Sequence, residues 1–361
     1  MEKILSAAAP HWLPDRIRPP DEDAARESER RWNTVAKPLG GLGLLEGLVI
    51  KIAGLTGSAD VDISRRAVLV LCADNGVVRE GVSQSGSEVT MIVAGNLTRG
   101  LTSVCRMASV AGADVIPVDM GMATRPSFDG LVDCRVSDGT KNIAEGPAMT
   151  RAEAECAVAR GVGLARVCAE RGYKLIATGE MGIGNTTTSG AIISVMLGIP
   201  PESAAGRGAG LSDDALAHKI EIVRRAIAVN EPDPLDPLDV LHKLGGFDIA
   251  GLAGVFLGGA IYRIPVLIDG LISAAGALIA ERLRPGASCA MLPSHRSGER
   301  ASGAVLSALG LAPVIDAGMR LGEGTGAVAA IPLLDMALAV YNGSSSFSDI
   351  GIDAYTPFGN T

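Results

Sequence analysis

The segment from Arg320 to Ala327 contains the side chain best suited to do chemistry. It reads Arg-Leu-Gly-Glu-Gly-Thr-Gly-Ala, so a glycine stands on each side of Glu323. Glycines let a backbone press against a ligand, and a carboxylate at the edge of such a loop can act as a general base. An isolated Gly-Glu-Gly is more often a solvated surface turn. Similar glycine-rich junctions elsewhere favour the catalytic interpretation, with Leu321 and Gly322 beside the substrate.

A second junction, residues 179–188, reads Gly-Glu-Met-Gly-Ile-Gly-Asn-Thr-Thr-Thr. Closely spaced glycines before a helix, followed by Asn and Thr, offer N–H groups and side-chain donors to a phosphate. An ordinary strand-to-helix turn capped by Asn or Thr fits the same residues equally well. The spacing matches neither a dinucleotide fingerprint nor a Walker loop. The predicted ligand contacts here are Met181, Gly182, Gly184, Asn185 and Thr186.

Three further segments carry polar or charged groups next to glycines. Residues 206–211 read Gly-Arg-Gly-Ala-Gly-Leu and predict an anion contact at Gly208. Lys219, a short distance further on, can add positive charge to that contact, but the sequence is equally consistent with a solvated lysine on a helix surface. Asp248 suits a helix cap at least as well as a ligand contact. Residues 293–299 gather hydroxyls and cations, but they support a Ser-His nucleophile pair only weakly, because adjacent residues do not automatically face each other.

The elements around these segments alternate regularly. Apolar runs at 67–72, 115–118, 174–178 and 265–268 each lead into a polar turn, and helical patterns lie between them, including 151–171 and 218–229. This alternation predicts an α/β protein with a doubly wound, mostly parallel sheet and helices on both faces, in a Rossmann-like large domain. Ligand loops then lie at the carboxyl ends of the strands.

The two ends of the chain lack this alternation. A polar helix is expected within residues 13–35 and an apolar one at 44–55. We therefore expect residues 1–55 and the tail 331–361 to form a small helical lobe, and residues 56–330 to form the large domain.

Composition narrows the class of partner. The 361 residues are 47% hydrophobic and only 3% aromatic, so Ala, Val, Leu and Ile must build the core. A net charge of −8 disfavours nucleic acid and anionic membranes and favours a small substrate. Six scattered cysteines and four histidines without ligand spacing predict reduced thiols, no metal and no cofactor. The first residues lack a signal-peptide pattern, and apolar runs such as 250–262 are shorter than the ~20 residues of a membrane span, so we expect a soluble, cytoplasmic protein.

Taken together, these segments resemble the nicotinate-nucleotide:dimethylbenzimidazole phosphoribosyltransferases, which prepare the lower-ligand nucleotide of cobamides. The matching blocks occur in order over almost the whole chain: 37–43, 73–77 with 80–82, 146–149, 179–187, 245–248, 269–270, 293–295 and 320–327. The resemblance implies transfer of phosphoribose from β-nicotinate mononucleotide to an aromatic base, which gives an α-ribosyl nucleotide and nicotinate. It also implies a metal-free homodimer, and a mixed dimer with a paralogue stays open.

The resemblance assigns roles to particular residues. It places the catalytic glutamate on Glu323 and a second acid, close to the base pocket, on Glu180; the phosphoribosyl part falls on Gly182, Lys219, Asp269 and Ser297. The chemistry agrees, because a cationic pyridinium leaves with little acid help, while the incoming azole must lose its N–H proton to a base. Nearby carboxylates would stabilise positive charge on the ribose. Attack opposite the leaving group accounts for the β-to-α inversion.

Two positions depart from the family pattern. Asn75 stands where many relatives have His, and Val93 stands where some have a Gln beside the acceptor. With Ser85 as a further acceptor contact, the acceptor can be a benzimidazole, a purine or a phenol. A noncatalytic nucleotide-binding relative is a different hypothesis, which the intact Glu180 and Glu323 disfavour. A dinucleotide-dependent oxidoreductase is disfavoured because no Gly-x-Gly-x-x-Gly follows a strand.

Overall fold

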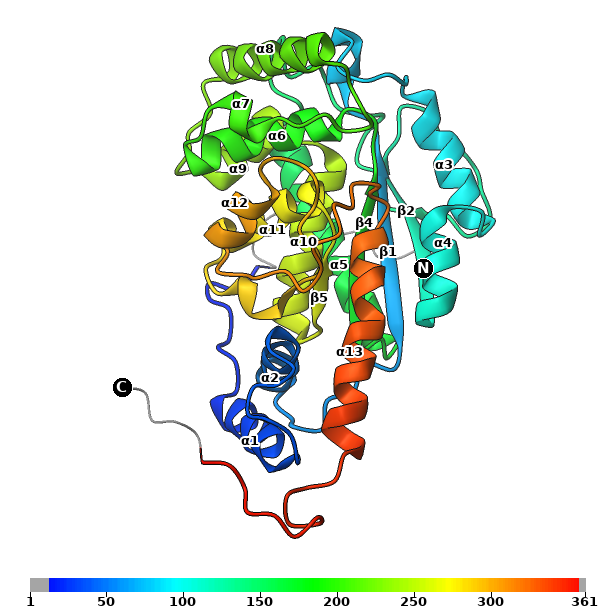
Figure 1. Cartoon of the computed structure of the whole chain (residues 1–361). Helices are drawn as coiled ribbons and strands as arrows, with labels where there is room; N and C mark the ends of the chain where they lie inside the picture. Colours follow the sequence, from blue (N-terminus) through cyan, green and yellow to red (C-terminus); the bar gives the residue numbers. More distant parts are fainter. Residues whose placement is uncertain (1–12, 357–361) are drawn as a thin grey trace.

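The computed structural model describes residues 13–356, so the outer ends of the expected lobe, 1–12 and 357–361, lie outside the described residues. A six-stranded sheet runs through the described chain in the order β3-β2-β1-β4-β5-β6, and every neighbouring pair is parallel. Figure 1 shows β1, β2, β4 and β5 of this sheet. The strands are β1 (Arg66–Ala73), β2 (Ala113–Gly121), β3 (Val132–Asp133), β4 (Leu175–Met181), β5 (Val266–Ile268) and β6 (Met291–Pro293). From β1 the chain adds β2 and β3 on one side of the sheet, and it then returns to add β4, β5 and β6 on the other side of β1. This order confirms the prediction of a doubly wound sheet.

Helices connect the strands and cover both faces of the sheet. Their bounds are α1 (Glu22–Thr34), α2 (Leu44–Thr56), α3 (Glu88–Thr98), α4 (Ser103–Ala111), α5 (Arg151–Glu170), α6 (Asn185–Leu197), α7 (Pro201–Ala204), α8 (Asp213–Asn230), α9 (Pro237–Leu244), α10 (Phe247–Tyr262), α11 (Leu271–Leu283), α12 (Ser302–Ala308) and α13 (Thr325–Gly343). Two short 3-10 helices occupy Gly76–Glu80 and Ala287–Ala290. The predicted helices at 44–55 and 151–171 are confirmed almost to the residue, whereas the one predicted from residue 218 begins earlier, at Asp213.

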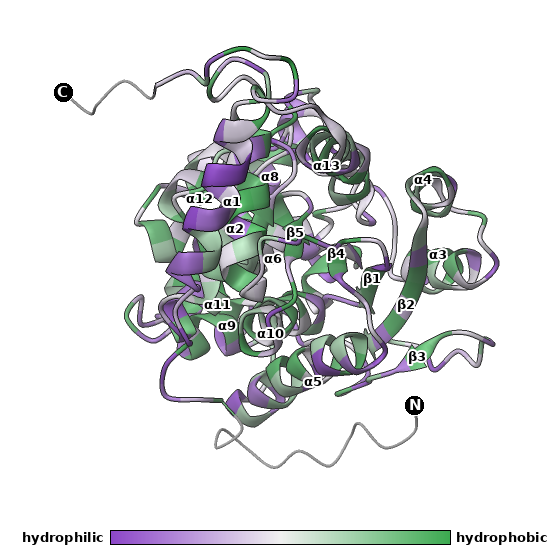
Figure 2. Ribbon diagram, turned by 90° about the horizontal axis from the view of Figure 1, so that it is seen from below, coloured by the Kyte–Doolittle hydropathy of each residue, from purple (hydrophilic) through white to green (hydrophobic). Residues whose placement is uncertain are grey.

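Side chains of β1 divide between two hydrophobic cores because successive strand residues point to opposite faces. Leu69 and Leu71 belong to the core shared with α5, α10 and α11, while Val70 and Cys72 belong to the core shared with α2, α4 and α13. Figure 2 shows α4 and α13 on one side of the strands and α5 and α10 on the other. All six cysteines are free thiols.

Helix α10 is buried along almost its whole length, between the sheet and α5 and α11. Small residues allow its close contact with α5, since a Cβ atom added at Gly161 would lie 2.8 Å from the Cα of Gly254. This close helix contact lets small residues fill a core that has few aromatic side chains.

Helix α13 is apolar and long enough to cross a bilayer by length and composition alone. Half of that stretch is buried inside the protein, against α2, α4 and β4, and its Asp335 pairs with Arg66. These contacts are those of a core helix.

The two ends of the described chain pack together. Tyr341 on α13 donates its hydroxyl proton to the Ala59 carbonyl at 2.9 Å, and its hydroxyl oxygen lies 3.1 Å from Ser28 Oγ. Val35 and Ser346 form an antiparallel bridge. These contacts suit a lobe built from both termini; its borders at 55/56 and 330/331, the second of which falls inside α13, stay predictions.

Candidate active site

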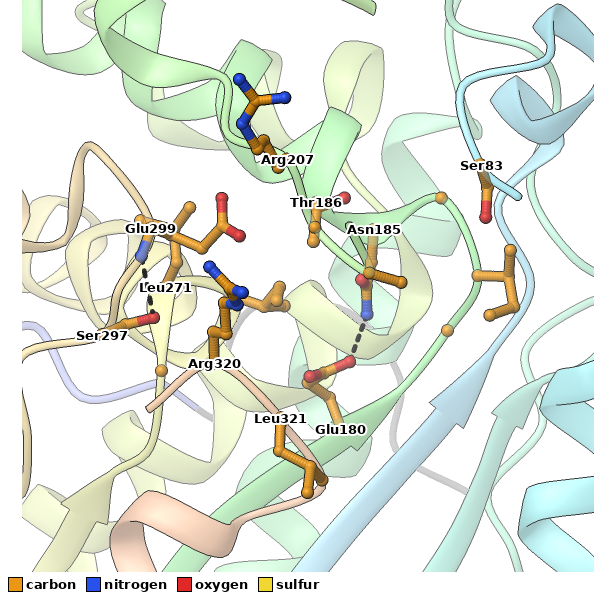
Figure 3. A pocket seen from close by; sticks show the side chains of 18 of the residues that line it. Ser83, Glu180, Asn185, Thr186, Arg207, Leu271, Ser297, Glu299, Arg320 and Leu321 are labelled. Atoms are coloured by element: carbon orange, nitrogen blue, oxygen red, sulfur yellow. Dashed lines mark hydrogen bonds between the residues drawn. The ribbon is translucent and has the colours of Figure 1, made fainter. Parts of the chain in front are cut away.

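One cavity opens at the carboxyl ends of the central strands, where the loops after β4, β5 and β6 meet the loop before α13 (Figure 3). It brings together twelve of the predicted site residues: Glu180, Met181, Gly182, Gly184, Asn185, Thr186, Gly208, Lys219, Ser297, Leu321, Gly322 and Glu323. These residues come from positions up to 143 apart in the sequence, because the strand order places β4 beside β5 and α13 beside β4.

The loop that carries Glu323 has an unusual backbone. Gly322, Glu323 and Gly324 have φ angles of +86°, +61° and +95°, and left-handed φ costs a non-glycine residue about 1–2 kcal/mol. Glu323 is half-buried, and one of its carboxyl oxygens, Oε2, is buried without a hydrogen-bond partner. A solvated surface turn does not have these features, so the structure excludes that alternative for Glu323.

Asp269 holds this loop from beneath. Its buried carboxylate accepts hydrogen bonds from the backbone amides of Gly324 at 3.1 Å, Gly326 at 2.7 Å and Ala327 at 3.0 Å. Asp269 does not line the cavity. In this structure it therefore fixes the start of α13, and with it the position of Glu323.

Burial raises the pKa of the Glu323 carboxyl. The backbone amide of Val104 and the hydroxyl of Thr102 favour the ionised form, but they offset the cost of burial only in part. A carboxylate whose pKa lies above its usual value is a better proton acceptor, as a general base needs.

Glu180 lies at the end of β4, next to the Glu323 loop. A Cβ atom at Gly322 would lie 2.8 Å from Glu180 Oε1, so the two segments touch. Burial, followed by the charge of Asp248, raises the pKa of Glu180 to about 8. The Asn185 side chain donates to the Glu180 carboxyl, as the dashed line in Figure 3 shows.

Positive charge lines another part of the same cavity. Lys219 on α8 is 1% exposed, and its ammonium donates to Thr186 Oγ1 at 2.7 Å. Burial lowers the pKa of Lys219 to about 8. The burial of Lys219 excludes the alternative of a solvated surface lysine. An anionic group can bind between the ammonium, Thr186 and Gly208, which all line the cavity.

The segment after β6 supplies Ser297 and His295 to the cavity. Ser297 Oγ accepts from the Glu299 amide at 3.3 Å. Ser294 Oγ does lie 3.1 Å from His295 Nδ1, but this hydroxyl is buried and donates to the Ile268 carbonyl. The Ser294 hydroxyl therefore has a structural hydrogen bond and is not available as a nucleophile.

Two predicted acceptor contacts, Ser85 and Val93, are absent from the cavity lining of the described chain. Ser85 bonds through its amide to Ser83 Oγ at 3.2 Å, and Ser83 itself faces the cavity. Val93 is half-buried on α3 and packs against the core on the α13 side of the sheet.

The structure adds three charged side chains that the sequence did not single out, Arg207, Glu299 and Arg320. Figure 3 shows Glu299 and Arg320 projecting into the same space. All three stand in segments already marked by glycines, but the pattern gave no sign of which flanking charge faces inward. Within residues 13–356, no group of three His, Cys, Asp or Glu residues is placed to hold a metal ion.

Comparison with known families gives a match over most of the chain. A family model described as phosphoribosyltransferase matches residues 17–352. The chain is 47% identical over 329 residues to the nicotinate-nucleotide–dimethylbenzimidazole phosphoribosyltransferase of Acetivibrio thermocellus, covering 91% of this chain and 94% of that protein. It is 46% identical over 323 residues to the protein of the same name from Escherichia coli, covering 89% and 90%.

Solved structures agree with this match. The crystal structure of CobT from Thermus thermophilus superposes with a TM-score of 0.87 at 38% identity, over 92% of this chain and all of that one. A second structure from the same organism, of a nicotinate-nucleotide–dimethylbenzimidazole phosphoribosyltransferase, gives a TM-score of 0.86 at 37% identity, over 92% and 99%.

Proposed function

This chain belongs to the nicotinate-nucleotide–dimethylbenzimidazole phosphoribosyltransferase family, and we propose that it transfers phosphoribose from nicotinate mononucleotide to an aromatic base. The products are an α-ribosyl 5′-phosphate of that base and nicotinate, and the reaction serves cobamide biosynthesis. The observation that carries this proposal is a cavity with a buried ammonium, Lys219, and three carboxyl groups, Glu180, Glu299 and Glu323, in its walls.

The phosphate of the nucleotide fits the positive part of the cavity. No carboxylate in the described chain forms an ion pair within 4.0 Å of Lys219, whose hydrogen-bond partner is the neutral hydroxyl of Thr186. The charge of Glu299 favours the ammonium, but burial still lowers the pKa of Lys219 to about 8, so a phosphate would add counter-charge that the site lacks. Gly208 leaves room for the anion, because a Cβ atom there would approach both Thr186 and Lys219.

The carboxyl groups account for the reaction. We assign Glu323 as the base that removes the N–H proton of the incoming azole, since its Oε2 has no partner and its pKa is raised. Glu180 faces the ribose and, when ionised, stabilises positive charge as the bond to nicotinate breaks. The pyridinium leaves as neutral-ring nicotinate, so no acid is needed at that position.

The cavity offers mainly apolar surface to the acceptor base. Val82, Met181 and Leu321 provide apolar surface in the cavity, and Leu321 is 56% exposed at its edge. Such a lining suits 5,6-dimethylbenzimidazole but also purines and phenols, because it selects acceptors by their shape more than by their hydrogen-bonding groups. The role of Val93 stays a prediction, and a shift toward benzimidazoles in Val93→Gln would support it.

We also propose that the protein acts in the cytoplasm as a homodimer. Large apolar side chains are exposed on α3, α4 and α13, namely Ile92, Val110 and Met336, and such surfaces suit an interface. Light scattering on the purified protein tests the assembly; a monomer at all concentrations contradicts the dimer.

The activity is tested by incubating the protein with nicotinate mononucleotide and 5,6-dimethylbenzimidazole and measuring both products. We expect nicotinate and the α-ribosyl nucleotide in equal amounts, and no nicotinate without acceptor. Nucleotide binding without product would instead support the noncatalytic alternative.

A further inference from the structure

A buried chain of three polar side chains lies behind the cavity. Asn185 Nδ2 donates to Glu180 Oε2 and, at 2.9 Å, to Asp248 Oδ2. Glu180 and Asn185 line the cavity, whereas Asp248 is fully buried on α10 and does not. Asp248 thus reaches the Glu180 carboxyl through Asn185, and its carboxyl also lies against the backbone of Gly182.

The backbone holds the Asp248 carboxyl in this position. A Cβ atom at Gly182 would lie 2.6 Å from Asp248 Oδ2, and one at Gly246 would overlap Oδ1. Oδ1 also accepts from the Ile249 amide at 2.9 Å. Enclosed on two sides by glycine backbone, the carboxyl cannot turn away from Asn185.

The surroundings of this chain are acidic. No Lys, Arg or His among residues 13–356 forms an ion pair within 4.0 Å of Glu180 or Asp248. The carboxyl groups whose charges act on the pair are Asp74, just after β1, Asp269, just after β5, and Glu323 in the loop before α13; the Cys72 thiol nearby is neutral, because burial raises its pKa. Two buried carboxylates that share one amide and have no cation cannot both ionise at low cost.

We propose that Asp248 is a positioning residue for the transfer reaction: through Asn185 it aims the Glu180 carboxyl into the cavity, and the two carboxyl groups hold one proton between them until the pyridinium ring of the nucleotide binds. This inference rests on the proposed function, because the positive charge of the pyridinium ring is what displaces the proton. On binding, the proton leaves Glu180 for solvent and the carboxylate faces the positively charged ring.

The proton resides on Glu180 in the empty site. Asp248 stands in the first turn of α10, where the helix N-terminus favours negative charge, and it accepts the additional Ile249 amide. Glu180 has the Asn185 amide as its one side-chain donor in the described chain. In keeping with this order, burial raises the pKa of Asp248 to about 6 and that of Glu180 to about 8.

Infrared difference spectroscopy on the full-length protein without substrate tests the shared proton directly. At neutral pH we expect the carbonyl stretch of a protonated, buried carboxylic acid, lost in Glu180→Gln and lost on adding nicotinate mononucleotide. No such band in the wild-type protein at neutral pH overturns the proposal. This measurement is independent of turnover, so it separates failure of this inference from failure of the proposed function, which shows as no product from any acceptor.

Kinetics of Asp248→Asn test the positioning role. In the wild type we expect the acid limb of the kcat/KM profile for nicotinate mononucleotide near pH 8, where Glu180 ionises. Asp248→Asn removes the negative charge next to Glu180, so its pKa should fall and the acid limb should move to lower pH by about one unit or more. We expect kcat to fall roughly 10- to 100-fold as Glu180 loses its orientation. Asp60→Asn, which removes a carboxylate that is 94% exposed, is the control and should change neither. An unchanged acid limb in a folded Asp248→Asn protein overturns the positioning role.

Discussion

The Glu323 carbonyl lies against the Cα of Gly179, so closely that a Cβ atom at position 179 would lie 2.6 Å from the Glu323 carbonyl carbon. Gly179 is part of β4, and Glu323 is in the loop before α13. The loop that carries Glu323 therefore packs directly on the strand that also carries Glu180. Because the two backbones approach so closely, a side chain at position 179 would collide with the Glu323 loop.

Gly179→Ala should displace the Glu323 loop and lower kcat by about 100-fold, the cost of a misplacement of roughly 1 Å at a catalytic group. Gly47→Ala is the matched control, since position 47 faces open space on α2 and alanine there favours the helix by up to about 1 kcal/mol. Steady-state kinetics of both proteins measure the difference. If Gly179→Ala turns over like Gly47→Ala, the loop does not depend on this contact.

Asp269→Asn tests whether Asp269 positions the loop or binds the nucleotide. The Asn side chain keeps one acceptor oxygen for three backbone amides and loses the charge, so at least one hydrogen bond to a charged group, worth about 1.5–3 kcal/mol, should go. We expect a lower free energy of unfolding together with a lower kcat, measured by urea denaturation and kinetics. An unchanged unfolding midpoint with only a raised KM for nicotinate mononucleotide would instead show direct contact with the nucleotide.

Lys219→Ala should mainly raise the KM for nicotinate mononucleotide, because a phosphate contact exists in both ground and transition states. The loss of a charged hydrogen bond corresponds to roughly 10- to 100-fold. Lys219→Met, which keeps an apolar chain of similar length, separates loss of charge from loss of packing. Kinetics with each substrate varied separately measure the effect, and a rise confined to the acceptor's KM would remove Lys219 from the phosphate site.

The same lysine should set the alkaline limb of the pH profile. Its pKa in the empty site is about 8, lowered by burial from 10.5. As pH rises through that value the free site loses its positive charge, so phosphate binding weakens and the KM for nicotinate mononucleotide rises. The wild type should therefore lose kcat/KM above about pH 8, and Lys219→Met should lack this limb. The same alkaline limb in Lys219→Met would assign it to another group.

Much of the fold was predictable because long apolar runs ending in polar turns mark buried parallel strands. β1, β2, β4 and β5 were found in this way. β3 and β6, with two and three residues, are too short to show periodicity and exist only because β2 and β5 offer them an open edge.

The position of Glu323 and Glu180 in a cavity was predictable because both stand in glycine-rich segments, while their roles stay predictions. The sequence could not show that Asp269 binds amides 55 to 58 residues away, nor that Lys219 is buried. Both depend on how α13 and α8 pack against the sheet. Asp248 is a first-turn helix acid, as its position suggested, but its contact with Asn185 arises only when α6 and α10 are brought together.

Acceptor choice should be broad. An apolar lining discriminates by shape, and one missing methyl-sized contact is worth only about 1–3 kcal/mol. We expect 5,6-dimethylbenzimidazole, benzimidazole and at least one smaller or phenolic acceptor to react, with kcat/KM values within roughly 10- to 200-fold of one another. A competition assay measures this ratio. Rates below about a thousandth of the dimethylbenzimidazole rate for every other acceptor would show a pocket that reads specific polar groups.

The assignment of Glu323 as the base is tested most directly by nicotinate release from Glu323→Gln with 5,6-dimethylbenzimidazole as acceptor. The substitution keeps the size of the side chain and should leave the fold and nucleotide binding intact, which circular dichroism and calorimetry verify. We predict that turnover falls roughly 10²- to 10⁴-fold, the usual effect of removing a general base. Turnover close to that of the wild-type protein would contradict the assignment.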